Sequence, residues 1–430
     1  MNKNTHRIPG LVLTDHEFNL PLDYKNPDGE KLTVFAREIV APERETEQLP
    51  WLLFLQGGPG YHAPRPKENS GWLKRAIQEY RVLLLDQRGT GLSSPVLSQT
   101  MQRFATPQEQ ADYLKFFRAD SIVNDAEWIR DQLVGKRKPW SVLGQSYGGF
   151  CAVHYLSAAP DSLREVLLTG GVPPLDKSPD EIYRATYRKV IEKNRLYFER
   201  YPGDVKRVAD ICAYLDENKV HLPGSGRLSV KRFQQLGIVF GSSNGFEHVH
   251  YMLENAFVAG AEGLELNYSF LRSVEKAQVF EEYPIYALLH EPIYCQNEAS
   301  NWSAESVRQE YPQFEAQRGR PFYFTGEMIY PWMFDEYEYL KPLKQAAEIL
   351  AAYDGWPSLY DLSVLEANRV PCAAAVYYND MYVDRQLSQH SADKINGIKL
   401  WITNEHEHNA LRSRGEIVLD RLLGMVKGSI

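Results

Sequence analysis

The feature of this sequence that most constrains its fold is a serine flanked by glycines, at the point where a strand pattern gives way to a helix pattern. Residues 140–143 form a short apolar run, residues 144–148 read G-x-S-x-G around Ser146, and residues 150–158 have helical character. A serine on such a sharp turn projects its hydroxyl away from the sheet, and the glycines remove side chains that would clash there. We therefore predict that Ser146 is a nucleophile.

Other short apolar runs also end in glycine-rich loops, which is typical of buried parallel strands. They alternate with stretches of helical spacing, so we predict an α/β chain with a mostly parallel sheet. Residues 10–50 indicate instead an antiparallel hairpin or meander. The predicted strands are residues 51–55, 81–85, 140–143, 166–169, 371–378 and 397–403, and the clearest helices are residues 120–135, 150–158 and 414–427.

The length of the chain, 430 residues, exceeds what one small domain needs. Residues 175–350 differ from the rest in composition and pattern. They are rich in charged and aromatic side chains at helical spacing and poor in apolar strand runs. We predict a core made of residues 1–174 and 351–430, with a helical cap domain, residues 175–350, inserted between its two parts.

Charge and composition exclude several classes of function. The formal net charge is −8 and no Lys/Arg-rich run occurs, so we expect no nucleic-acid partner. No uncharged apolar run approaches the roughly 20 residues of a membrane helix, and residues 1–13 lack the apolar segment of a signal peptide. We expect a soluble, cytoplasmic protein with no membrane partner. Neither a zinc site nor a disulfide framework is expected of the four widely spaced cysteines, Cys151, Cys212, Cys295 and Cys372.

A serine hydroxyl is a weak nucleophile and needs a base that a carboxylate orients. In hydrolases with this kind of serine the chain order is Ser, then Asp or Glu, then His. Asp380 follows the next-to-last predicted strand, and His408 follows the last one. Asp384 and Asp361 are weaker candidates for the carboxylate. His406 competes with His408, since one of the two is expected to point at the serine.

The oxyanion that forms when a hydroxyl attacks a carbonyl needs preorganised N–H donors. We expect one donor to be the backbone N–H of Tyr147, directly after the nucleophile. The second should come from the loop at Gly57 and Gly58, where the lack of side chains lets the backbone approach a substrate closely.

Together these segments resemble the prolyl aminopeptidases (proline iminopeptidases), serine peptidases of the α/β-hydrolase fold. Residues 56–60, Q-G-G-P-G, are similar to the family's H-G-G-P-G loop, and residues 86–93 to its D-Q-R-G-x-G-x-S segment. Residues 144–149 are similar to its G-G-S-W-G-S/G elbow, and residues 405–409 lie where the family keeps its catalytic histidine.

The resemblance implies an α/β-hydrolase core with an inserted helical cap, and a serine aminopeptidase that uses Ser146, Asp380 and His408 without a metal or other cofactor. It also implies that glutamates of the cap bind the α-ammonium of short peptides with a free N-terminus. Glu327 is the first candidate, because its segment is similar to the family's I-E-x-H-Y-F, and Glu291 is the second.

Some positions depart from the family pattern. Gln56 replaces the usual His, Tyr147 replaces the usual Trp, and the cap is longer, which leaves the strictness of a proline preference open. An esterase or another amide hydrolase with the same triad also stays open, as do a non-catalytic binding protein on this scaffold and a homo-oligomer. Carboxylates in the pocket would favour an ammonium substrate, whereas an all-apolar pocket would favour esters or lipids.

Overall fold

The computed structural model describes residues 4–224, 226–261, 263–315 and 322–430, and its central feature is a nine-stranded sheet. The strand order is β1-β2-β3-β5-β4-β6-β7-β10-β11. Pairs from β1 to β5 are antiparallel, and every pair from β5 across to β11 is parallel. The strands are β1 Asn4–Ile8, β2 Leu11–Pro21, β3 Lys31–Val40, β4 Trp51–Leu55, β5 Arg81–Leu85, β6 Trp140–Gln145, β7 Leu163–Thr169, β10 Cys372–Tyr377 and β11 Ile398–Thr403.

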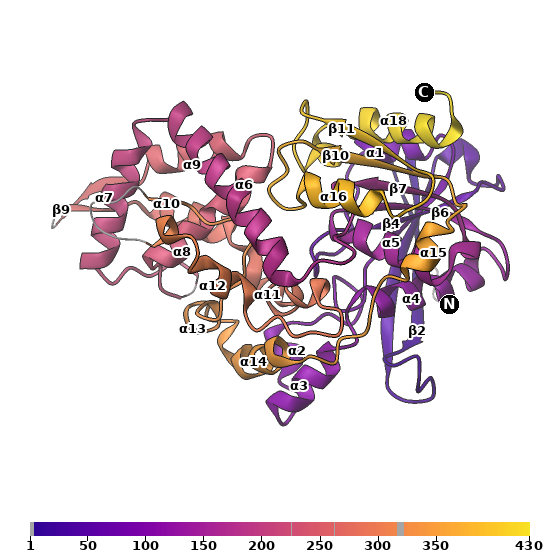
Figure 1. Ribbon diagram of the computed structural model, residues 1–430, viewed down its shortest axis with the longest axis horizontal. Coiled ribbons are helices and arrows are strands. Elements are labelled where there is room, and N and C mark those ends of the chain that lie inside the picture. Colours follow the sequence, from indigo (N-terminus) through magenta and orange to yellow (C-terminus); the bar gives the residue numbers. More distant parts are fainter. Residues whose placement is uncertain (1–3, 225, 262, 316–321) are drawn as a thin grey trace.

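Helices cover both faces of this sheet (Figure 1). Successive residues of β4 alternate between the two resulting cores: Leu52 and Phe54 pack with α1 and α18, whereas Leu53 and Leu55 pack with α4 and α5. Because both faces are buried here, the central strands β4 and β5 have continuous apolar runs rather than an alternating pattern. The helices of the core and its connections are α1 Gly71–Ala76, α2 Ser98–Met101, α3 Pro107–Leu114, α4 Ala119–Leu133, α5 Tyr147–Ala158, α15 Leu362–Glu366, α16 Arg385–Ala392, α17 Ala410–Ser413 and α18 Gly415–Lys427.

The chain from α6 to α14 forms a second group of elements, which Figure 1 shows gathered to one side of the sheet. Its core is aromatic: Tyr197 stacks on Phe240 with ring centroids 4.7 Å apart, and Phe240 meets Phe324 edge-on at 5.4 Å. We propose residues 175–350 as the limits of this cap. Its α-helices are α6 Pro179–Arg200, α7 Asp204–Glu217, α8 Val230–Gln234, α9 Gly245–Glu254, α10 Tyr268–Ala277, α11 Pro284–Leu289, α12 Ser303–Arg308, α13 Met333–Glu336 and α14 Lys344–Ala352.

The predicted fold class, an α/β chain with a mostly parallel sheet, is confirmed. One detail of the cap differs from the expectation of a wholly helical insertion, because β8 (Phe257–Gly260) and β9 (Gly263–Leu266) form an antiparallel pair. Each strand is four residues long, with an apolar run in F-V-A-G and an alternation in G-L-E-L, and patterns this short do not distinguish a strand from a helical segment. Within the described ranges, no helix has the length and apolarity needed to cross a membrane.

Candidate active site

Ser146 lies at the turn from β6 to α5 with φ 56° and ψ −127°, a backbone conformation that L-residues rarely adopt. The flanking glycines are required by close backbone contacts. A Cβ on Gly144 would lie 2.4 Å from the carbonyl oxygen of Gly148, and a Cβ on Gly148 would lie 1.9 Å from that of Leu55. The glycines of the G-x-S-x-G pattern are therefore needed because the turn is packed against β4 too tightly for side chains.

The predicted oxyanion donors lie beside this serine. A Cβ on Gly57 would be 2.8 Å from the Cβ of Ser146, and Gly58 has φ +134°, a conformation that favours glycine. Tyr147 is the first residue of α5, so its N–H has no acceptor within the helix and is free to meet an anion. Their role as oxyanion donors stays a prediction.

The segment of residues 86–93 supports the loop that carries Gly57. The side-chain amide of Gln87 donates to the carbonyl oxygen of Gln56 at 2.9 Å. Arg88, fully buried, forms an ion pair with Asp125 at 2.6 Å and thereby anchors its own loop. This family-like segment is therefore part of the architecture around the serine rather than of the cavity wall.

Asp380 and His408 meet at the carboxyl ends of neighbouring parallel strands, β10 and β11. Asp380 Oδ2 lies 2.7 Å from His408 Nδ1, and its Oδ1 accepts backbone N–H bonds from Tyr382 at 2.9 Å and Val383 at 3.1 Å. Burial alone would lower the pKa of His408, but the charge and hydrogen bond of Asp380 outweigh it and raise that pKa above its ordinary value. The pair is thus arranged as an oriented imidazole base.

The competing candidates have other partners. Asp384 accepts N–H bonds from Gln386 and Leu387 and caps α16, and Asp361 caps α15 in the same way. His406 packs edge-on against Trp401, with ring centroids 5.8 Å apart. The structure therefore brings Asp380 together with His408 and places the alternatives in structural roles.

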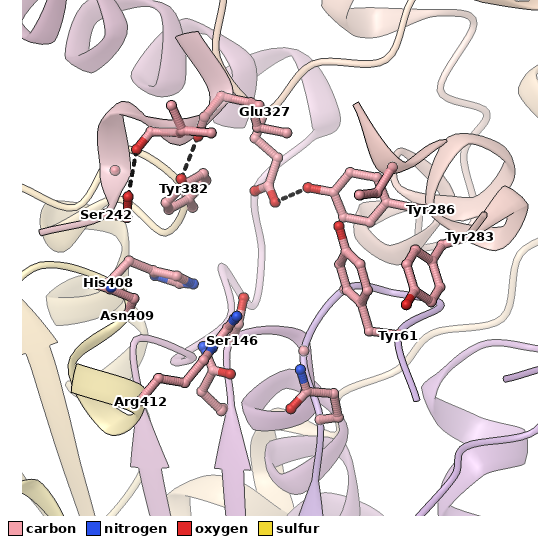
Figure 2. A pocket seen from close by; sticks show the side chains of 18 of the residues that line it. Tyr61, Ser146, Ser242, Tyr283, Tyr286, Glu327, Tyr382, His408, Asn409 and Arg412 are labelled. Carbon is pink, nitrogen blue, oxygen red and sulfur yellow. Dashed lines mark hydrogen bonds between the residues drawn. The ribbon is translucent and has the colours of Figure 1, made fainter. Parts of the chain in front are cut away.

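A cavity of about 480 Å³ lies between core and cap, with Ser146 and His408 in one wall and Glu327 in the other (Figure 2). A cavity of this size suits a small ligand or the end of a peptide. Its lining residues are Gln56, Gly57, Gly58, Tyr61, Gln145, Ser146, Ile238, Val239, Gly241, Ser242, Ala277, Val279, Phe280, Glu282, Tyr283, Tyr286, Glu327, Tyr382, His408, Asn409 and Arg412.

Glu327 brings a negative charge into this cavity. Its carboxylate accepts a hydrogen bond from the hydroxyl of Tyr286 and lies 3.4 Å from His290 Nε2. His290 is fixed in turn by the hydroxyl of Tyr183, 3.1 Å from its Nδ1. Burial raises the pKa of Glu327, but His290 and Tyr286 outweigh burial and hold that pKa below its usual range. An ionised, largely buried carboxylate is suited to bind an ammonium group.

The structure does not bring Glu291, the second predicted ammonium ligand, to this cavity. Its carboxylate accepts backbone N–H bonds from Ser303 at 3.2 Å and Ala304 at 2.9 Å, the first two residues of α12. Burial raises its pKa to about 7. Glu291 satisfies N–H groups at a helix start that would otherwise lack acceptors, and this structural use corrects the predicted one.

The sequence offers Trp302, Tyr330, Trp332 and Phe334 as aromatic pocket walls, but other aromatic residues line this cavity. They include Tyr61, Tyr283, Tyr286 and Tyr382, which Figure 2 shows around the space between Glu327 and the core. Two of them could have been found from their positions in the sequence, since Tyr61 directly follows the Q-G-G-P-G loop and Tyr382 comes two residues after Asp380. In the part of the chain that the structure describes, no three His, Cys, Asp or Glu side chains are grouped as metal ligands.

Cap and core are joined beside the Asp380–His408 pair. Lys193 of α6 forms an ion pair with Glu407 at 2.7 Å. The side-chain oxygen of Asn409 accepts the backbone N–H of Ser243 at 3.1 Å. In addition, the hydroxyl of Tyr382 donates to the carbonyl oxygen of Ile238 in the cap. The cap therefore contacts both chain neighbours of His408 and the loop of Asp380.

The chain is similar to several known proteins. A family model described as alpha/beta hydrolase fold matches residues 50–255. A proline iminopeptidase of Aeromonas sobria is 50% identical over 417 residues, which cover 97% of each chain. A proline iminopeptidase of Aspergillus aculeatus is 36% identical over 443 residues, covering 100% of this chain and 97% of the relative. Among solved structures, a proline iminopeptidase of Mycobacterium smegmatis has 13% identity and a TM-score of 0.43 over 96% of this chain and 100% of its own.

Proposed function

This chain belongs to the proline iminopeptidase family of the α/β-hydrolase fold, and we propose that it releases N-terminal residues, proline first among them, from short peptides. The observation that carries the proposal is one cavity with two unlike walls. Ser146 and the Asp380–His408 pair lie on the core side, and the ionised carboxylate of Glu327 lies on the cap side. Such a site can hold a free amine while a nucleophile attacks the neighbouring carbonyl.

The proposed reaction is acyl transfer. Glu327 holds the substrate ammonium, His408 takes the hydroxyl proton of Ser146, and the serine oxygen bonds to the carbonyl carbon of the first residue. Backbone N–H groups of Tyr147 and the Gly57–Gly58 loop stabilise the oxyanion. His408 then gives its proton to the leaving amine as the peptide bond breaks. Water, deprotonated by His408, then bonds to the acyl carbon, and His408 returns that proton to the serine oxygen as the bond between serine and the acyl group breaks.

An esterase with the same triad is the main alternative. The buried charge of Glu327 argues against it, because an ionised carboxylate beside an uncharged ester would lack a counter-charge from the substrate. We also propose the cytoplasm as the location, which the free thiols of all four cysteines support.

The test compares initial rates on proline, alanine and leucine arylamides, N-acetylproline arylamide and a nitrophenyl ester, for the wild type and Ser146→Ala. We expect cleavage of the arylamides, fastest for proline, with loss on N-acetylation because the ammonium is gone. Ser146→Ala should abolish cleavage of every substrate. Cleavage of the ester alone would reject the aminopeptidase proposal, and full activity of Ser146→Ala would reject the nucleophile.

A further inference from the structure

Arg412 is a cation of the cavity that the proposed reaction does not use. It lies in α17, four residues after His408, and its exposed side chain lines the cavity that holds Ser146 (Figure 2). Among the described residues, none forms an ion pair or side-chain hydrogen bond with its guanidinium. The charged side chains of the cavity wall are Arg412 on the core side, together with the imidazole of His408 as a base, and Glu282 and Glu327 on the cap side.

Opposite charges face this cavity from its two walls. The charges of Glu327 and Arg412 both act on Tyr61, Tyr382 and His408, with Glu327 raising and Arg412 lowering the pKa of each. The rings and imidazole between the two charged groups therefore lie within electrostatic reach of both. A zwitterionic ligand would match this arrangement.

The direction in which a peptide must lie follows from the reaction. If the ammonium is on Glu327 and the first carbonyl is at Ser146, the leaving residue lies on the other side of the serine. His408 must reach the nitrogen of that residue to protonate it. Arg412 lines the same core wall as Ser146 and His408, across the cavity from Glu327 (Figure 2).

We propose that Arg412 binds the free C-terminal carboxylate of dipeptide substrates, so that the site recognises both ends of a short zwitterionic peptide. The inference rests on the proposed aminopeptidase function. A planar guanidinium presents paired N–H donors that fit a carboxylate in bidentate geometry. Glu282, also exposed in the cavity wall, would repel that carboxylate, so Arg412 is the group that can discriminate in its favour.

The experiment measures kcat/KM for prolyl-glycine, prolyl-glycinamide and proline arylamide. Four proteins are compared: the wild type, Arg412→Gln, Arg412→Lys, and Arg414→Gln, which alters an exposed arginine two residues on that does not line the cavity. We expect the wild type to prefer the free acid over the amide by about tenfold or more, the size of one charge-assisted contact. Arg412→Gln should bring this ratio close to one, mainly through KM, and Arg412→Lys should retain part of it.

The ratio isolates the carboxylate, because any effect of the variant on His408 acts equally on acid and amide. Arg414→Gln should keep the wild-type ratio. A wild-type ratio near one, or an unchanged ratio in Arg412→Gln, would overturn the proposal. Failure of the wild type on proline arylamide would instead count against the proposed function, so the two failures are distinguishable. Circular dichroism of Arg412→Gln and Arg412→Lys checks that each variant is folded.

Discussion

The core and the cap hold their parts of the site by different means. In the core, backbone lies against backbone: a Cβ on Gly148 would meet the carbonyl oxygen of Leu55, and a Cβ on Gly149 would lie 2.3 Å from that of Gly171. In the cap, side chains hold a side chain, as Tyr286 and His290 do for Glu327. The core thus fixes the proposed reacting groups through close backbone packing at short glycine motifs, and the cap fixes the proposed recognition charge through contacts between side chains.

The largest effect should come from the core. Asp380→Asn removes the charge that orients and stabilises His408, and we expect kcat to fall about 10⁴-fold. The loss should be similar for an arylamide and an ester, because the chemistry of the core is common to both. An ester rate near that of the wild type would show that the base does not depend on this carboxylate.

Backbone packing can be compared directly in the two regions. Gly148→Ala places a Cβ 1.9 Å from a core carbonyl oxygen, and we expect a loss of about 3 kcal/mol or more in the free energy of unfolding. Gly326→Ala in the cap meets a methyl group of Val190 at 2.5 Å, which a side-chain shift can relieve, so about 1 kcal/mol is expected. Urea denaturation of both variants measures the difference, and equal losses would contradict the comparison.

Substitution of the recognition charge should be selective. Glu327→Gln keeps the shape of the side chain but removes its charge, and we expect kcat/KM for proline arylamide to fall about 10- to 100-fold. Hydrolysis of a nitrophenyl ester without an amine should fall much less. Equal losses on both substrates would indicate that Glu327 supports the fold of the cavity rather than the ammonium.

Glu291 offers the matched control for Glu327. Glu291→Ala leaves the N–H groups of Ser303 and Ala304 without their acceptor, and we expect a loss of about 2 kcal/mol in the free energy of unfolding. The ratio of arylamide to ester rates should stay at the wild-type value. Because burial raises the pKa of Glu291 to about 7 in the folded chain, its contribution to stability should decrease as pH rises from about 4.3 towards 7. Denaturation at pH 5 and pH 7.5 tests this sign.

The smallest effect concerns the pH dependence. His408 must be neutral to act as a base, and its pKa is raised by Asp380 and also by the charge of Glu327. The activity of the wild type should therefore decline as pH falls through a value above the usual histidine pKa. In Glu327→Gln this decline in activity should occur at lower pH. An unchanged pH profile would show that the charge of Glu327 does not raise the pKa of His408.

The difference between the regions also explains what could be predicted from the sequence. The positions of Ser146, Asp380 and His408 follow from strands that are recognisable in the sequence, since Ser146 comes directly after β6, Asp380 three residues after β10 and His408 five residues after β11. Their assignment as a catalytic triad stays a prediction. The cap offers no such frame, so only similarity to the family's motif ranks Glu327 above Glu291 in the sequence. The two glutamates differ in their contacts, because Glu291 binds the start of α12 and Glu327 binds Tyr286. These partners are 12 to 41 residues away in the sequence.

The bonds that join the cap to the residues around His408 have a further consequence. A cap tied to Glu407, Asn409 and Tyr382 cannot swing away without displacing the loops that carry the imidazole and its carboxylate. We therefore expect substrates to enter end first, through the mouth of a chamber whose roof stays in place. The depth of the cavity would then limit how far the N-terminal end of a peptide can enter. That limit would place the first peptide bond, rather than a later one, at the serine.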